Sequence, residues 1–306
     1  MNMRNKMIAW VAGVVTVVVV LIVVIVSLEP PGTRISRAQA FKAMALALTT
    51  KEDCEAREAA RETSYFSGKE RNNWFVKYMD YLYEEGYLDP ALTPPTLSSA
   101  QGDLTYAEAA HMASCVAGRL RVQVGSNRHN EDSYFPEDEW WRLYDRILAE
   151  VDPEGNVRTV EAILYGTPSN LPQAESWTAY TTEGNFGFQG LALDTYLDCR
   201  IRFLARDGEM IAMRDLVSRE VVYENVWLAK AEGDTFTAYL GTASREFPAS
   251  GTEEERASLS GNLADLHLDN GTLTRVTIKK ERISGKGLPV TDTYIEIEGY
   301  GQIPLS

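Results

Sequence analysis

The sequence has few of the residues that bind metals or form disulfides. Three cysteines and three histidines occur among 306 residues, and the three cysteines lie far from one another. No C-x-x-C pair and no H-E-x-x-H spacing is present, which argues against zinc fingers and zinc proteases. We expect no metal and no cofactor. A disulfide between Cys54 and Cys115 is the alternative to three free thiols.

The sequence also lacks a basic stripe and a catalytic motif. Its net charge of -14 argues against nucleic acid as a partner, because phosphate binding requires clustered Lys and Arg. No G-x-S-x-G or phosphate-loop motif occurs. Carboxylate pairs such as Glu137 and Glu139 can carry out glycoside chemistry, but 44 acidic residues make such pairs common by chance. We therefore expect a protein that is not an enzyme.

Charge is absent from one long stretch near the start. Residues 8–28, "IAWVAGVVTVVVVLIVVIVSL", contain no charged residue, and a helix of this length spans about 30 Å, the thickness of the hydrocarbon layer. We predict a single transmembrane signal anchor, with a cleaved signal peptide as the alternative. Arg4 and Lys6 precede it, so residues 1–7 are expected in the cytoplasm and the rest outside the cell membrane.

After a short stem at residues 29–33, the next region repeats the pattern of a helix start. Ser36 with Gln39, and Thr105 with Glu108, form two capping boxes, each followed by apolar residues at helical spacing. A Trp-led helix follows each box. Residues 34–165 are therefore predicted to form an α-helical repeat module, with a truncated third copy that begins at Val157.

Strand signals dominate the remainder. Residues 166–195 are rich in Gly, Pro, Ser and Thr, which predicts a linker or long loop. Residues 196–306 alternate apolar and polar residues around turn pairs such as Asp207-Gly208 and Asn270-Gly271. The last strand pattern, with Ile295 and Ile297, runs close to Ser306, which suggests a β-rich module that is truncated. The expected fold class is α+β multidomain: a transmembrane helix, a helical module and a mostly antiparallel β barrel or sandwich.

The helical openings carry a family resemblance. Residues 35–39, "ISRAQ", and 104–108, "LTYAE", resemble the I-T-R-A-E start of S-layer homology repeats, and "NNWFVKYMDYLYEEGYLD" resembles their Trp-led segment. The resemblance implies a module that holds cell-wall polymers, with Arg37, Trp74, Tyr106 and Trp140 as candidate polymer-binding residues. The motif arginine is kept at Arg37 only. Aromatic residues at helical spacing are also typical of a core, and that alternative stays open.

A second resemblance concerns the whole chain. The anchor and repeats, followed by "ADLHLDNGTLTRVTIKKERISGKGL" and "YIEIEGYGQIPL", resemble the N-terminal part of membrane-anchored proteins of the stage II sporulation protein D / LytB family. In that family a later domain cleaves peptidoglycan glycan strands, with its glutamate on a helix resembling E-A-L-K-A-Q-A-V-A-A-R-T-Y-A. No such segment occurs in this sequence.

The functional prediction follows from these resemblances. We expect a membrane-tethered, extracytoplasmic, non-catalytic arm that binds or positions other components at the cell wall, in sporulation or peptidoglycan remodelling. The alternative is a truncated or divergent lytic transglycosylase. A transmembrane signalling receptor is a third class, disfavoured by the short cytoplasmic segment.

Overall fold

The computed structural model describes residues 33–120, 130–241, 243–249 and 251–279, together with three strands near the C-terminus. The hydrophobic stretch at residues 8–28 lies outside the described residues. Among the helices that are described, none is long and apolar enough to cross a membrane. The longest, α7, has 15 residues.

The first part of the described chain is helical. Its largest apolar core gathers residues from every long helix, and most of α2 is buried. Both predicted capping boxes are confirmed, at Ser36 and at Thr105. The elements are α2 (Arg37–Leu48), α3 (Lys51–Ala60), η1 (Gly68–Asn72), α4 (Val76–Glu84), α5 (Leu97–Gln101), α6 (Tyr106–Val116) and α7 (Glu137–Val151).

Three helix openings meet at the centre of this helical module. The segments before α2, α6 and α7 form isolated bridges in all three pairings: residues 34 with 136, 36 with 103, and 105 with 134. Each opening buries one apolar side chain, namely Ile35, Leu104 or Phe135. The third repeat therefore opens at Phe135. The prediction that it begins at Val157 is wrong, because residues 158–166 form a strand.

A closed five-stranded barrel follows directly, with strand order β1-β2-β3-β5-β4. Strand β1 is apolar on both faces, since Ala162 and Leu164 point into the barrel core while Ile163 and Tyr165 pack on a second core. A run buried on both sides carries no alternation, so periodicity could not separate it from a helix. The strands are β1 (Arg158–Gly166), β2 (Thr178–Thr181), β3 (Gly184–Gly187), β4 (Cys199–Arg206) and β5 (Glu209–Ser218), with η2 (Asp194–Tyr196) before β4.

A curled five-stranded sheet comes next, in the order β10-β9-β6-β7-β8. The predicted hairpins are confirmed at Asp207-Gly208, between β4 and β5, and at Asn270-Gly271, between β9 and β10; all four residues have positive φ. The elements are β6 (Glu220–Glu232), β7 (Thr235–Leu240), β8 (Ala243–Pro248), α8 (Glu253–Ala257), β9 (Asn262–Asp269) and β10 (Thr272–Ile278). The chain then forms β11 (Gly287–Val290), β12 (Tyr294–Ile297) and β13 (Gly301–Pro304), so the single predicted tail strand is a hairpin.

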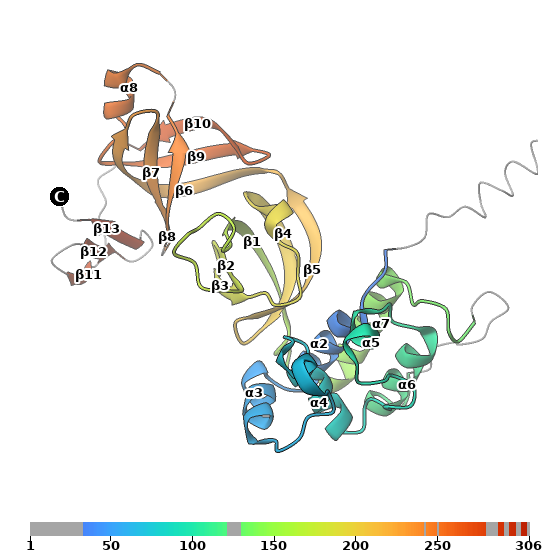
Figure 1. Cartoon of the computed structure of the whole chain (residues 1–306). Helices are drawn as coiled ribbons and strands as arrows, with labels where there is room; N and C mark the ends of the chain where they lie inside the picture. Colours follow the sequence, from blue (N-terminus) through green and yellow to red (C-terminus); the bar gives the residue numbers. More distant parts are fainter. Residues whose placement is uncertain are drawn as a thin grey trace, which may run out of the picture.

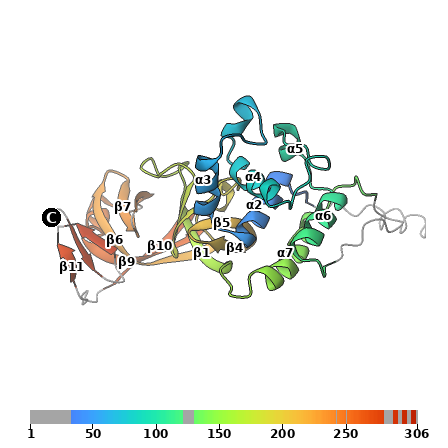
Figure 2. The ribbon, with the colours of Figure 1, turned by 90° about the horizontal axis from the view of Figure 1, so that it is seen from below.

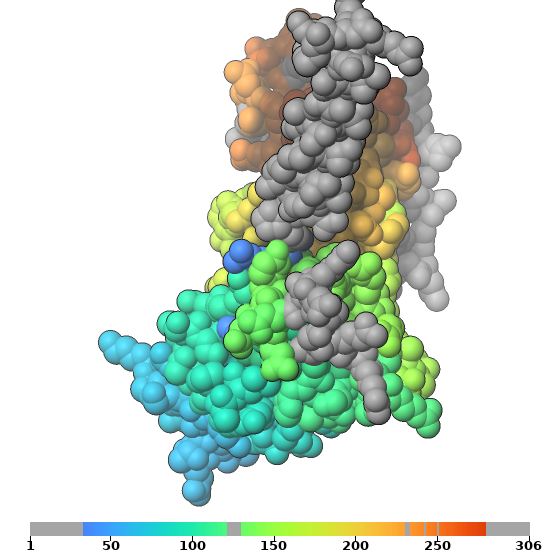
Figure 3. Space-filling view, turned by 90° about the vertical axis from the view of Figure 1, so that its right-hand side faces the viewer, coloured from blue at the N-terminus to red at the C-terminus, as the bar shows by residue number. Residues whose placement is uncertain are grey.

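The barrel lies between the helical module and the curled sheet (Figures 1 and 2). In the space-filling view the helices, coloured blue to green, form one end of the molecule and the orange strands lie toward the other (Figure 3). The helical core continues into the barrel, because Leu204 of β4 and Ile211 of β5 belong to it.

The predicted fold class is wrong. None of the described helices can serve as the transmembrane helix that it included. The strand-rich part is also not one barrel or sandwich after a linker: residues 166–195 supply β2 and β3 to the barrel, and a separate sheet follows. Short strands of four residues, rich in Gly and Thr, gave no periodic signal.

Candidate functional site

The structure places Arg37 between two repeats. Its Nε lies 2.6 and 2.7 Å from the two carboxylate oxygens of Glu108, and its guanidinium also donates to the carbonyl of Ser99. Glu108 is buried and accepts further hydrogen bonds from Thr93 and Thr105. Arg37 thus joins the openings of α2 and α6, and its charge is already paired.

Two of the predicted aromatic residues belong to the core. Tyr106 is buried and donates a hydrogen bond to Glu139 of α7, the same kind of contact that Arg37 makes with Glu108. Trp140 is fully buried, and its Nε1 has no partner among the described residues. Burial leaves neither ring a face for a polymer.

Trp74 lies at the boundary with the barrel. It is half-buried, its ring packs edge-on against Phe75, and it lies directly over Gly190.

Cys54 is buried and Cys115 is exposed, and both are free thiols in the structure. Burial raises the pKa of the Cys54 thiol to about 12.

A buried ion pair joins the helical module to the barrel. Lys42 of α2 donates to Glu209 of β5 at 2.5 Å and to the carbonyls of Gln189 and Met210. Both charged side chains are 1% exposed, and Lys51 adds a second contact to Glu209 at 3.1 Å. Burial lowers the pKa of Lys42 to about 8, an effect that the charge of Glu209 opposes.

A groove lies where the starts of α7 and α2 would make the third contact of this kind. Glu137 is the first residue of α7, as Arg37 is of α2. Gln39 is the third residue of α2, as Glu108 is of α6. Instead of bonding to each other, Gln39 donates to the carbonyl of Gly190 and Glu137 accepts from Trp141 Nε1. The hollow between them has a volume of about 380 Å³ and continues along the barrel past Leu191, Ala192, Tyr196 and Arg214.

A second hollow of about 300 Å³ adjoins the first, because both are lined by Leu191 and Ala192. Its wall carries Trp177, which is 47% exposed and packs edge-on against Phe188. Trp177 also has a φ of 59°. Positive φ is rare for a bulky residue and marks a position that the surrounding structure holds in place.

Polar groups lie beside Trp177 in the second hollow. Asp194 accepts hydrogen bonds from the hydroxyls of Thr167 and Ser169, at 2.8 Å each. The two hollows together form what we call the junction groove, lined by Gln39, Glu137, Trp141, Trp177, Leu191, Ala192, Asp194, Tyr196 and Arg214 among others.

Sequence reasoning missed the junction groove for two reasons. Trp177, Asp194 and Tyr196 fall at or beside the region that was interpreted as a linker, where no periodic pattern drew attention to them. Trp140 and Trp141 are adjacent, and the sequence alone could not show which of the two rings faces the core. A bulky aromatic in a Gly- and Ser-rich stretch was the signal available.

The groove offers binding chemistry. The exposed face of Trp177 can stack on rings, and the carboxylates can accept hydrogen bonds from hydroxyl groups. Among the described residues no group of His, Cys, Asp and Glu has the arrangement of a metal site.

Comparison with known proteins adds no relative to this description. No protein-family model matches the chain, no curated protein matches it, and no solved structure matches its fold. The two family resemblances of the sequence therefore stay predictions.

Proposed function

We propose that this protein is a non-catalytic arm of the cell envelope that binds a wall polymer in the junction groove and holds it at a fixed position. The observation that carries this proposal is a pair of hollows that share Leu191 and Ala192, one lined by both the helical module and the barrel and the other lined by the exposed Trp177.

The chemistry of the groove fits a polymer of sugar rings. The apolar faces of pyranose rings stack on tryptophan, and their hydroxyls donate to carboxylates such as Asp194. Two hollows that share lining residues can engage more than one ring of a linear chain. The guanidinium of Arg214 pairs with Asp145 and lies over the ring of Trp141, 4.9 Å from its centroid, so it holds this wall of the groove in place.

The junction supports the positioning role. The walls of the groove come from both the helical module and the barrel, and these are joined by a shared apolar core and by the buried pair of Lys42 and Glu209. A site whose walls are fixed to each other binds without a large cost for ordering them. The envelope location rests on the sequence of residues 8–28, through which the chain would be tethered to the membrane.

A retention assay tests the proposal. The full-length protein, purified in detergent, is mixed with isolated cell walls, and the bound fraction is measured across protein concentrations. We expect binding that weakens about fivefold or more for Trp177→Ala, because exposed tryptophans in binding sites contribute more than about 1 kcal/mol. The matched control is Tyr65→Ala, an aromatic residue 43% exposed on the helical module and outside the groove.

Two results would contradict the proposal. Failure of the unaltered protein to bind walls would remove the binding role, and equal binding by Trp177→Ala would remove the groove. A zymogram on peptidoglycan addresses the non-catalytic part: clearing of the substrate by the purified chain would favour the lytic transglycosylase alternative.

A further inference from the structure

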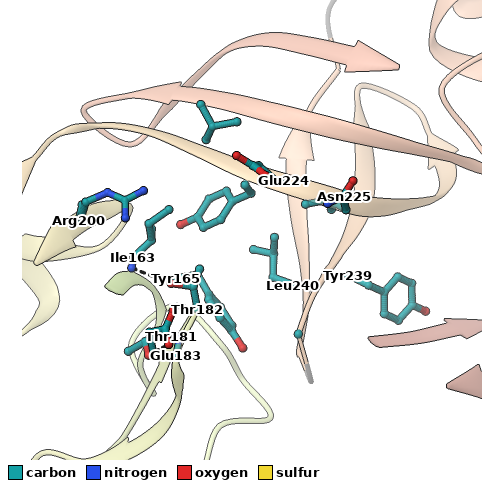
Figure 4. A pocket seen from close by; sticks show the side chains of 14 residues that line it. Ile163, Tyr165, Thr181, Thr182, Glu183, Arg200, Glu224, Asn225, Tyr239 and Leu240 are labelled. Atoms are coloured by element: carbon teal, nitrogen blue, oxygen red, sulfur yellow. Dashed lines mark hydrogen bonds between the residues drawn. The ribbon is translucent and has the colours of Figure 1, made fainter. Parts of the chain in front are cut away.

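A separate cleft lies between the barrel and the curled sheet. Its volume is about 470 Å³, within the range of small-molecule sites. One wall comes from β1, β4 and the β2–β3 turn, and the other from β6 and β7. It shares no lining residue with the junction groove. Figure 4 shows this cleft with the side chains that line it.

Charges of both signs enter the cleft from different elements. Arg200 reaches in from β4, Glu224 from β6 and Glu183 from the β2–β3 turn (Figure 4). Glu183 and Glu224 are exposed and Arg200 is half-buried. None of these three side chains forms an ion pair with another described residue. The cleft therefore holds one guanidinium and two carboxylates that are available to a ligand.

A bulge in β6 directs Glu224 into the cleft. The register between β6 and β9 shifts between Tyr223 and Val226, and Asn225 within the bulge has a φ of 57°. The bulge is held from behind, because Asp265 accepts from the backbone amide of Asn225 and Lys279 donates to its side chain. Bulges next to binding sites commonly redirect a side chain in this way.

The two walls are fixed to each other by a buried network. Asp198, the residue before β4, accepts from the two terminal guanidinium nitrogens of Arg245 on β8, at 2.5 and 2.7 Å, and from the hydroxyl of Tyr223 on β6. Asp198 is buried, and burial holds the pKa of Tyr223 well above its usual range. The cleft is therefore preorganised and does not need to close around a ligand.

We propose that this cleft binds a short zwitterionic peptide, with its carboxylate on Arg200 and its ammonium group on Glu224. Guanidinium groups bind carboxylates through paired, charge-assisted hydrogen bonds, and carboxylates do the same for ammonium. A neutral sugar would leave the three charges without a counterpart, so the cleft differs in ligand class from the junction groove.

Calorimetric titration with simple peptides tests this assignment. The probes are trialanine, which carries both charges, N-acetyl-trialanine, which lacks the ammonium group, and trialanine amide, which lacks the carboxylate. The full-length protein in detergent is expected to bind trialanine at least about tenfold more tightly than either blocked form, because each loses a charge-assisted contact.

Matched variants locate the binding. Arg200→Gln is expected to remove the preference for trialanine over its amide while keeping the preference over the acetylated form. Arg202→Gln is the control, because Arg202 lies on the same strand but pairs with Glu161 and Asp215 outside the cleft. Circular dichroism checks that both variants keep the fold.

Three outcomes would overturn the proposal: no heat of binding with trialanine at millimolar concentration, equal affinity for the three peptides, or an unchanged preference in Arg200→Gln. Each can be told apart from failure of the junction groove, which is tested by wall retention of Trp177→Ala and not by these peptides.

Discussion

At the scale of single residues, Glu108 is the buried charge with the most hydrogen bonds among the residues that the structure describes. It accepts hydrogen bonds from the guanidinium of Arg37, from the hydroxyls of Thr93 and Thr105, and from the backbone amide of Thr105. Its side chain is 1% exposed and that of Arg37 is 18% exposed. A buried charge with all its partners is tolerated, whereas removal of one partner leaves the other uncompensated.

We therefore expect Glu108→Ala and Arg37→Ala each to lower the free energy of unfolding by about 3 kcal/mol or more. Urea denaturation followed by circular dichroism measures the change, and the double variant should lose less than the sum of the two. The control is Asp138→Ala, which breaks the exposed pair with Arg142 and should change stability by less than about 0.5 kcal/mol.

This prediction bears on Arg37 as a polymer-binding residue. If Arg37→Ala unfolded at the same urea concentration as the unaltered protein, the ion pair would be dispensable and the arginine would be available to a ligand. If it is destabilised as expected, weaker wall binding by that variant would report partial unfolding and not a lost ligand contact.

At the scale of elements, the loop between β3 and η2 determines the shape of the junction groove. Gly190 in this loop has a φ of 83° and lies against the indole of Trp74, and its carbonyl accepts from Gln39. A side chain at this position would be strained by the backbone and would also collide with the ring. Only glycine permits this close approach between the loop and the helical module.

Two glycine variants separate these effects. Gly190→Ala should lower the free energy of unfolding by more than about 2 kcal/mol, since overpacking adds to the strain of positive φ. Gly208→Ala has a similar φ of 74° but nothing within 4 Å of the added carbon, so it should cost about 1 kcal/mol. Thermal unfolding of both proteins provides the comparison, and equal losses would show that the Trp74 contact is not close in solution.

At the scale of the whole molecule, the helical module and the barrel form one body through the pair of Lys42 and Glu209. The two residues are 167 positions apart in sequence, and their contact is buried on every side. Gly187 is packed against the carboxylate of Glu209, so any side chain at position 187 would collide with it. The junction therefore depends on both partners being present.

Lys42→Met should destabilise the protein by about 3 kcal/mol or more and separate the unfolding of the helices from that of the barrel, because it leaves Glu209 buried with Lys51 alone. The double variant Lys42→Met, Glu209→Met should recover much of this loss. Calorimetry distinguishes one transition from two. Lys51→Met serves as the control, since Lys51 is 27% exposed, and a single unchanged transition in Lys42→Met would contradict the role of the pair.

Local chemistry determined the parts of this fold that the sequence predicted. Capping boxes at Ser36 and Thr105 and turn pairs such as Asp207-Gly208 depend on residues within a few positions of each other, so their signals are complete in the sequence. The helical character of the first module followed from the same local patterns. The prediction of a membrane segment at residues 8–28 rests on the sequence alone.

Tertiary structure decided what long-range contacts control. Strand β1 is covered by apolar side chains on both faces. Strands β2 and β3 are stabilised by pairing within the closed barrel. Arg37 is half-buried and paired with Glu108, Trp140 lies in the core, and Trp177 lies exposed on the wall of a groove. Which side of a residue faces solvent depends on partners far away in the chain, and no local pattern records them.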